Sequence, residues 1–307
     1  MHLSEGILPI EQSIAWSAAA VPALVWSIRG ESKARKEDPS SAVLMAGATS
    51  LLFAGTLMPL PVPVVGATSH ICLTPLLALI VGVRRVLWPT FLVLLLHAMF
   101  FAHGGMTTLG VNTLTLGLIG PGVTVLLWNL LKGLGAKGAI GFGLAVGLGS
   151  MSVYVTDAAV LAVALADTAN PATTFGVVLV GFAPVQLPLS ILEAVVSVYI
   201  IRALATRRLG LVPEALRNLR LPKRESLTAL VVLMSIGLSG CAYEGIDGSI
   251  FGAEAESAGR APTDSIVDFS QGEMGLAMTI LILFGLGFIA GRSWERLKTA
   301  EQDGLSR

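Results

Sequence analysis

The sequence predicts an all-α membrane protein with a core bundle of seven helices, two further transmembrane helices at the carboxyl end, and the amino terminus outside. The first observation behind this is composition: 54% of the 307 residues are hydrophobic, only 13% are charged, and the mean hydropathy is +0.78. Soluble proteins carry roughly 25% charged residues. The second is that long apolar stretches recur from residue 12 to residue 291. The third is that basic residues are concentrated in alternate connections between these stretches.

The apolar stretches give nine expected spans. The 34 glycines suit helices that pack closely in lipid. The third and fourth stretches are short, so these helices are tilted, broken or partly buried in protein. The expected spans are residues 12–28, 41–60, 72–83, 86–102, 106–131, 138–166, 174–203, 226–242 and 273–291.

The distribution of charge sets the orientation. With the amino terminus outside, all of the 20 lysines and arginines except Arg260 fall on the inner side, as the positive-inside rule requires. We therefore expect a multi-pass protein in the lipid bilayer of the bacterial inner (plasma) membrane. The formal net charge is zero, which gives no indication of a nucleic-acid partner, and two cysteines are too few for a disulfide framework.

Three segments are expected along the chain: a core at 1–203, a basic cytoplasmic linker at 204–225, and a two-span unit at 226–307. The outer loop of this unit, at about 243–272, is acidic and rich in glycine and serine. It is either a flexible solvated loop or a surface that gathers cations or docks on the core. Cys241 ends a run that mimics a lipoprotein processing site, by coincidence or as a site of cleavage.

The amino terminus has the form of a metal claw. His2 can offer three coplanar nitrogens to one cation: the free α-amine of Met1, the His2 backbone amide and the His2 imidazole. A fourth nitrogen would complete a square, which suits Ni(II) or Cu(II) better than Zn(II) or Mg(II). His70, in a loop at the same membrane face, is the candidate for it; the alternative is a polar residue at a helix start. The groups available to orient the rings are Glu5, Thr68 and Ser69.

Two more histidines, His97 and His103, lie six residues apart, about 240° around a straight helix, so they are not expected to share a face. We expect His97 to bond a neighbouring helix and His103, which precedes two glycines, to line the entrance.

Three polar residues lie inside expected spans. Asp157 and Glu193 are carboxylates, which are costly in a bilayer and therefore point to function; the alternative is a protonated or hydrogen-bonded packing element. Asn112 lies among glycines and Pro121, in a stretch that can host a broken helix supporting the outer loops.

Several motifs together resemble one family. The start MHLSEGILP, with GATSH at 66–70, HGGMTTLGVN at 103–112, GLIGP at 117–121 and PLSILE at 188–193, resembles the substrate-capturing membrane components of energy-coupling-factor cobalt/nickel transporters, the CbiM/NikM family. The resemblance covers about residues 1–205; Ala194 stands where the family pattern would have glycine. The topology of the carboxyl-terminal unit resembles the small accessory component of these systems.

The resemblance implies a seven-helix fold with the amino terminus inserted into the bundle. It implies that the metal is held by the Met1 amine, the amide and imidazole of His2, and the imidazole of His70. It also implies partners, namely a coupling transmembrane subunit and two ATPase subunits.

The sequence thus predicts a component that captures Ni(II) or Co(II) outside and presents it for ATP-driven import, without an organic cofactor. Planar nitrogen chemistry leans to nickel, whereas the family includes both metals. There is no Walker A motif, so ATP hydrolysis is expected in partner subunits. One alternative is a self-contained secondary transporter or channel with Asp157 and Glu193 in a proton relay. The other is an intramembrane serine hydrolase with Ser150 as nucleophile and His97 as base.

Overall fold

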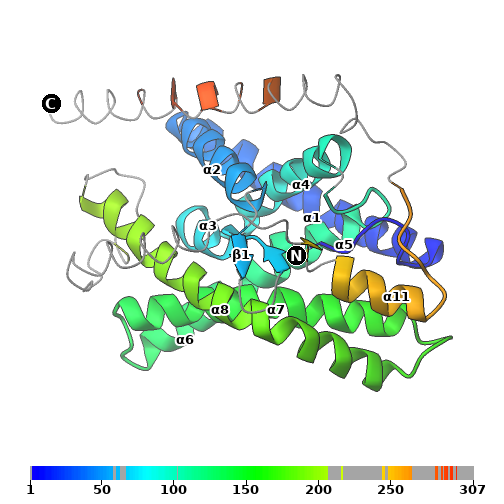
Figure 1. Cartoon of the computed structure of the whole chain (residues 1–307). Coiled ribbons are helices and arrows are strands. Elements are labelled where there is room, and N and C mark those ends of the chain that lie inside the picture. Colours follow the sequence, from blue (N-terminus) through cyan, green and yellow to red (C-terminus); the bar gives the residue numbers. More distant parts are fainter. Residues whose placement is uncertain are drawn as a thin grey trace, which may run out of the picture.

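The computed structural model describes residues 2–57, 60–62, 67–101, 103–206, 216, 244–245 and 248–264, with scattered positions between 281 and 295. Its helices and strands are drawn in Figure 1. In chain order they are α1 (Ile10–Glu37), α2 (Ser40–Leu57), β1 (Leu60–Val62), β2 (Ala67–Ser69), α3 (Thr74–Val81), α4 (Val83–Phe100), α5 (Leu109–Leu114), η1 (Thr115–Ile119), α6 (Gly120–Gly133), α7 (Ala139–Ala164), α8 (Pro171–Thr206), β3 (Glu244–Gly245), η2 (Gly248–Gly252) and α11 (Ala253–Ser257).

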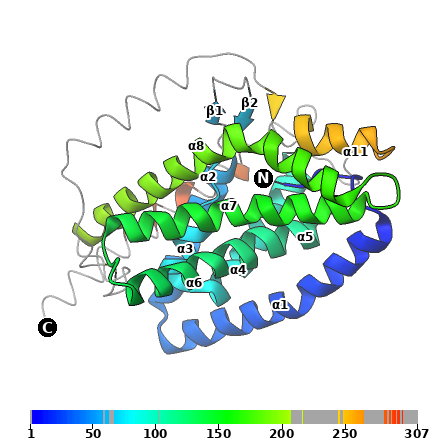
Figure 2. The same ribbon diagram turned by 90° about the horizontal axis from the view of Figure 1, so that it is seen from below.

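Among the residues that the structure describes, five helical segments are long and apolar enough to cross a membrane: α2, α4, the continuous rod Leu109–Gly133, α7 and Pro171–Ala205 within α8. α7 runs between α6 and α8, and α1 packs along α4 and α5 (Figure 2). Each segment matches an apolar stretch of the sequence to within a few residues. The predicted helical character of the core is therefore confirmed.

The short helix α3 is buried inside the bundle. Its eight residues make about 12 Å of helix, too little to cross a bilayer. Leu76 and Leu77 are buried where α3 packs against α4 and α6. Of the three options that the short apolar stretch left open, burial in protein is the one observed.

The stretch around Asn112 is part of one continuous helix that is wound differently for one turn, so the break that the sequence suggested is not observed. α5 ends at Leu114, and one π turn, η1, precedes α6. Gly117 lies in this turn, where an added Cβ would be 2.7 Å from the Leu87 side chain of α4. The small residue and the irregular turn together let the rod approach α4 closely.

A small three-stranded sheet was not predicted. β1 pairs antiparallel with β2, and β2 pairs parallel with β3 from the distant outer loop. Strands of two or three residues are too short to show an alternating pattern in the sequence. The sheet matters because β2 leads directly to His70.

Part of the acidic outer loop packs on the core. Phe251 is fully buried in the same apolar cluster as Leu3, with its ring centroid 4.5 Å from that of Phe182 on α8. The backbone amide of Thr263 donates to the Glu5 carbonyl at 3.1 Å. The interpretation as a docked surface therefore holds for this segment, which carries α11 in Figure 1, and the flexible-loop interpretation is wrong there.

The bundle has a basic end, where the connection between α1 and α2 and the start of α4 lie. Glu31 of α1 accepts from Arg35 at 2.8 Å and from Arg85 of α4 at 2.8 Å, and Arg85 also donates to Ser41 of α2 at 2.6 Å. This nearly buried carboxylate ties the three helices together.

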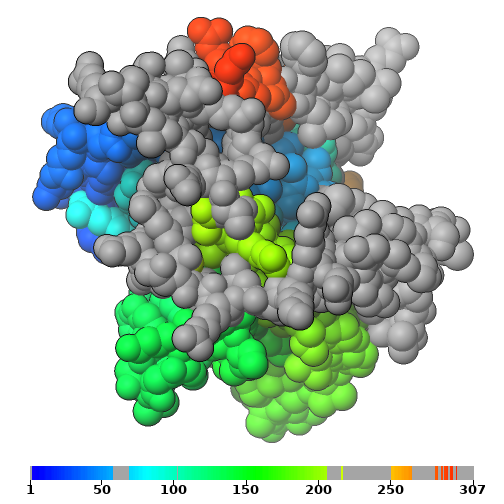
Figure 3. Space-filling model, turned by 90° about the vertical axis from the view of Figure 1, so that its left-hand side faces the viewer, coloured from blue at the N-terminus to red at the C-terminus, as the bar shows by residue number. Residues whose placement is uncertain are grey.

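Figure 3 shows the side of the molecule where the exposed connection between α6 and α7 (green) and the helix α8 (yellow-green) reach the surface.

Several predictions fall outside the described residues. These are Met1, the linker beyond Thr206 apart from Leu216, the expected span at 226–242 with Cys241, and most of the span at 273–291.

Candidate metal centre

The amino-terminal segment enters the bundle and its backbone is held by side chains. The Leu3 amide donates to Oδ1 of Asn112 at 2.9 Å, and the Leu3 carbonyl accepts from Nδ2 of Asn112 at 3.0 Å and from the Thr108 hydroxyl at 2.6 Å. The amide side chain thus takes the place of a neighbouring strand and satisfies both buried backbone groups of residue 3. Asn112 therefore fixes the backbone of the amino-terminal segment.

Glu5 ties this segment to the loop that carries His103. Its carboxylate accepts from the backbone amides of Met106 at 2.5 Å and Thr107 at 3.1 Å. Gly105 permits the approach, because an added Cβ would lie 2.7 Å from the Glu5 backbone. Glu5 therefore positions the loop, and its carboxylate is engaged by backbone amides.

His70 precedes a turn that Glu193 holds. Leu73 has φ of 57°, in the left-handed region that residues other than glycine rarely adopt. The Glu193 carboxylate accepts from the amides of Cys72 at 3.1 Å and Leu73 at 2.8 Å, and from the Ser150 hydroxyl at 2.7 Å. Helices α7 and α8 thereby set the position of the chain just after His70.

All four histidines of the sequence meet around the amino-terminal segment. The ring centroid of His2 lies 5.0 Å from that of His70, 4.4 Å from that of His103 and 6.3 Å from that of His97. Nδ1 of His2 is 2.9 Å from Nε2 of His103. Four imidazoles from four separate segments therefore form one cluster.

The straight-helix argument that separated His97 from His103 is wrong, because α4 ends at Phe100. The His103 amide donates to the His97 carbonyl at 3.2 Å, so the loop folds back over the helix end. The two ring centroids lie 5.7 Å apart. His97 also packs against Phe53 of α2, the neighbouring helix, at 4.8 Å.

The environment keeps the two principal imidazoles neutral. His2 and His70 are 1% and 3% exposed, and burial lowers the pKa of each well below its ordinary value of 6.5, with a further lowering from the nearby His103. Nδ1 of His70 lies 3.3 Å from the Ile71 carbonyl oxygen, which favours a proton on Nδ1 and leaves the lone pair on Nε2. Neutral imidazole is the form that binds a metal.

The structure also places the remaining residues that the sequence analysis named. The buried Ser69 hydroxyl accepts from Nε2 of Gln186 at 3.3 Å, and Thr68 lies in β2. Asp157 is fully buried on α7 and is not part of the metal-ligating group found among the described residues. Ser150 donates to Glu193 rather than to His97, so the serine–histidine pair of the hydrolase alternative is not formed.

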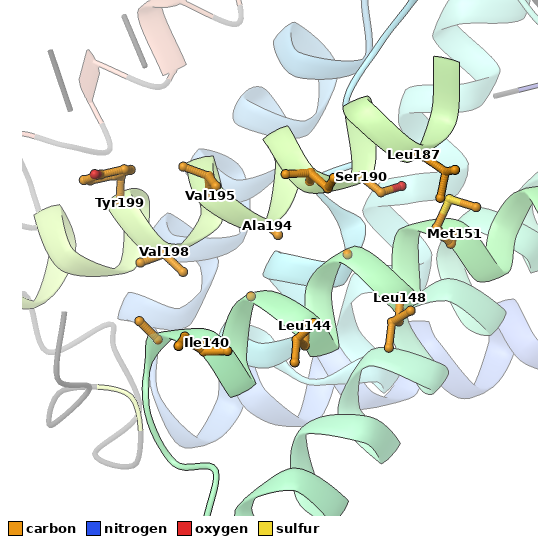
Figure 4. A pocket seen from close by; sticks show the side chains of 14 residues that line it. Ile140, Leu144, Leu148, Met151, Leu187, Ser190, Ala194, Val195, Val198 and Tyr199 are labelled. Atoms are coloured by element: carbon orange, nitrogen blue, oxygen red, sulfur yellow. The ribbon is translucent and has the colours of Figure 1, made fainter. Parts of the chain in front are cut away.

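A groove between α7 and α8 has a different chemistry. It encloses about 530 Å³ and is lined mainly by apolar and small side chains, among them Leu144, Gly147 and Ala194 (Figure 4). Its only side-chain oxygens come from Ser190, at 4% exposure, and Tyr199. With no histidine, cysteine or carboxylate in its lining, the groove offers no metal site.

The family model for CbiM, described as the cobalt uptake substrate-specific transmembrane region, matches residues 2–211. The chain belongs to the CbiM family. With five helical segments among the described residues long enough to cross a membrane, it is a multi-pass inner-membrane protein, and its family is one of cobalt uptake. Relatives of this family are named as transport proteins.

Among the CbiM relatives, the cobalt transport protein CbiM of Geobacter sulfurreducens is 29% identical over 97% of this chain and 90% of its own length. CbiM of Desulforamulus reducens is 34% identical over 73% of this chain and 87% of its own length. The first alignment thus extends through the carboxyl-terminal part of the chain.

Two crystal structures share the fold. One, described as a truncated transition metal transporter, has a TM-score of 0.57 and 23% identity, and covers 67% of this chain and 99% of its own. The other, described as a transition metal transporter, has a TM-score of 0.56 with the same identity, and covers 94% of its own chain. The likeness therefore spans about two thirds of this chain and nearly the whole of each solved chain.

The sequence missed His97 and Thr108 as parts of the site. Thr108 lies within the family-like stretch 103–112, four residues before Asn112 and one helical turn away, so the spacing to Asn112 was an available signal. For His97 no such signal existed, because its approach to His103 depends on where α4 ends.

Proposed function

We propose that the chain is the substrate-specific component of an energy-coupling-factor transporter, and that it captures Ni(II) or Co(II) on the outer side of the membrane. The ligands are the Met1 amine, the backbone amide and Nδ1 of His2, and Nε2 of His70. The observation that carries the proposal is the convergence of buried neutral imidazoles around an amino-terminal segment held by Asn112.

The chemistry of the donors supports a planar site. Only Nδ1 of His2 can close a six-membered chelate ring with its own amide nitrogen, and the Met1 amine closes a five-membered ring on the other side. Three such linked donors are planar, and His70, whose ring centroid lies 5.0 Å from that of His2, is close enough to supply the fourth nitrogen. Planar nitrogen donors suit d8 and d9 ions such as Ni(II), and cobalt is the cargo named for relatives.

The orientation follows from the two ends of the bundle. The histidine cluster lies at one end, whereas the basic connections and the Glu31 network lie at the other. Positive residues remain in the cytoplasm, so the metal site faces outward and the amino terminus is outside. A coupling transmembrane subunit and two ATPase subunits would then drive release inward, as the family resemblance implies.

The test is an extension of the amino terminus by Gly-Ser-Gly, with binding of Ni(II) and Co(II) measured by calorimetry on the purified chain without oxygen. A single added residue is avoided, because it would place the histidine third from a free amine and create a new planar chelate. Loss of the linked donors should weaken binding by about a hundredfold to ten-thousandfold.

The same three residues added at the carboxyl terminus are the matched control and should change nothing. Unchanged affinity in the amino-terminally extended chain would refute the claw. Cation uptake into liposomes by the purified chain alone would instead favour a self-contained secondary transporter.

A further inference from the structure

We propose that His2, His97 and His103 form a second site, a transfer site that holds an incoming divalent transition cation before the amino-terminal claw closes on it. The inference rests on the proposed function and deepens it. It starts from two imidazoles, those of His97 and His103, that the claw does not use although both lie against His2.

The three rings can converge on one ion. One nitrogen from each residue lies within 4.8 Å of the other two. Bonds of about 2.0–2.1 Å require ligand nitrogens roughly 3–3.5 Å apart. The pair formed by His2 and His103 is already at 2.9 Å. The third nitrogen has to approach by no more than roughly 1–2 Å, which side-chain rotation can supply.

The arrangement of the rings differs from that of the claw. The His2 ring is inclined at 86° to His97 and 84° to His103, and the latter two are inclined at 65° to each other. Three imidazoles from separate segments are not linked by chelate rings, so they do not force their nitrogens into one plane. They can therefore adopt the tetrahedral or octahedral coordination that Co(II), Ni(II) and Zn(II) all accept. The transfer site is therefore expected to select weakly, and the planar claw to select strongly.

Exposure gives the order of events. His103 is partly exposed, whereas His97 is fully buried and His2 is 1% exposed. An ion from outside therefore meets His103 first. His103 Nε2 contacts Nδ1 of His2, the same atom that the claw uses. An ion bound by both nitrogens can therefore leave His103 while it stays on Nδ1 of His2.

A separate first site also solves a chemical difficulty. The His2 amide nitrogen must lose its proton before it binds, and this occurs readily only when the ion is already anchored beside it. Neutral imidazoles bind without losing a proton. In the hand-over the ion stays on Nδ1 of His2 and leaves His97 and His103. It gains the Met1 amine, the deprotonated amide and His70, and water takes up both the amide proton and the proton of the Met1 ammonium group.

The experiment uses the full chain extended by Gly-Ser-Gly at its amino terminus, in which the claw is disabled. Titration with Co(II) under nitrogen, followed by visible absorption, should show one residual site with the bands of non-planar Co(II). His97→Ala or His103→Ala in this extended chain should weaken that site at least tenfold. Phe101→Leu, a ring neighbour of His97 without a donor atom, is the control and should leave it intact.

A second measurement uses the unextended chain. His103→Ala should slow the loading of Co(II) at least tenfold in stopped-flow experiments, while equilibrium affinity falls far less than in His70→Ala. If the extended chain binds no Co(II), or binds it equally well after both histidine substitutions, the transfer site is refuted while the claw stands. Equal losses of equilibrium affinity in His103→Ala and His70→Ala would also refute the transfer role. Failure of the proposed function shows instead as absence of tight binding in the unextended chain.

Discussion

Two segments carry the candidate ligands, and a buried polar side chain from a distant helix binds the backbone of each. The segment of His2 is held at Leu3 by Asn112, which donates one hydrogen bond and accepts another. The segment of His70 is held at Cys72 and Leu73 by Glu193, which accepts from two backbone amides and from Ser150.

The two anchors are different residue types because they satisfy different backbone groups. Residue 3 presents both an N–H and a carbonyl, so its partner must be an amide that can pair with both. Residues 72 and 73 present two N–H groups in a left-handed turn, so their partner must be an acceptor with two oxygens. A polar residue inside a span can therefore hold a loop in place, and its donor and acceptor atoms indicate which backbone groups of that loop it binds.

Glu193→Ala is expected to have the largest effect on stability and on metal binding. Two buried amides and a hydroxyl lose their acceptor, which should cost about 2–4 kcal/mol of stability. It should also weaken Ni(II) or Co(II) binding about 10–100-fold, because His70 loses its support. Calorimetry and thermal unfolding in detergent measure both. Ser197→Ala, at a buried position one turn further along α8, is the control. Equal behaviour of the two variants would contradict the anchoring role.

Asn112→Asp tests the other anchor and should have a somewhat smaller effect. The new side chain keeps its acceptor for the Leu3 amide but turns an oxygen toward the Leu3 carbonyl, where a donor is needed. We expect a loss of about 1–3 kcal/mol and about tenfold weaker metal binding, read out by the same two methods. The adjacent buried residue supplies the control, Thr113→Val, which should bind metal normally. Full affinity in Asn112→Asp would show that the backbone pairing is dispensable.

Gly105→Ala tests whether the close approach of the two outer loops matters. The added Cβ would meet the Glu5 backbone at 2.7 Å, so the amino-terminal segment must shift. We expect stability to fall by about 1–3 kcal/mol and metal affinity to fall severalfold. Gly122→Ala on α6 meets nothing within 4 Å and should be neutral or slightly stabilising. The idea fails if both glycine variants bind metal alike.

The smallest effect concerns the pH dependence of the metal-free protein. The pKa values of His2 and His70 are lowered by burial, so the unfolded chain takes up protons below pH 6.5 that the folded chain does not. Stability should therefore be fully present above pH 6.5 and fall as the solution is acidified toward the lowered pKa values. Each histidine contributes up to about 1.4 kcal/mol per pH unit. Thermal midpoints with chelator between pH 7.5 and 5.5 measure this, and His70→Gln should reduce the slope. An equal slope in that variant would mean that groups other than His70 cause the pH dependence of stability.

Much of the site was open to prediction from the sequence because its parts lie at special positions along the chain. The claw depends only on a histidine next to the terminus, and His70 follows from the side of the membrane on which its loop lies. The stretch around Asn112, with its glycines and Pro121, was expected to support the outer loops, and the Asn112 side chain does hold the segment of His2. Met1 lies outside the described residues, so its role stays a prediction.

Other features depend on contacts between residues far apart in sequence. The partners of Glu193 lie about 120 residues away, and no local pattern announces them. The docking of Phe251 on the cluster with Leu3, and the pairing of β3 with β2, are likewise long-range. In an acidic, glycine-rich loop such contacts give no periodic signal.

Apolar length and the side on which basic residues lie are set by the bilayer and not by neighbouring segments, so the amino-acid sequence was enough to predict a helical membrane protein. Chelate rings are built from adjacent bonds, so the donor atoms near the amino terminus could be predicted without neighbouring segments, and they stay a prediction. The cluster of four histidines, in contrast, exists only in the folded chain. That outcome depends on where α4 ends and on which distant side chains satisfy the backbone of two short loops.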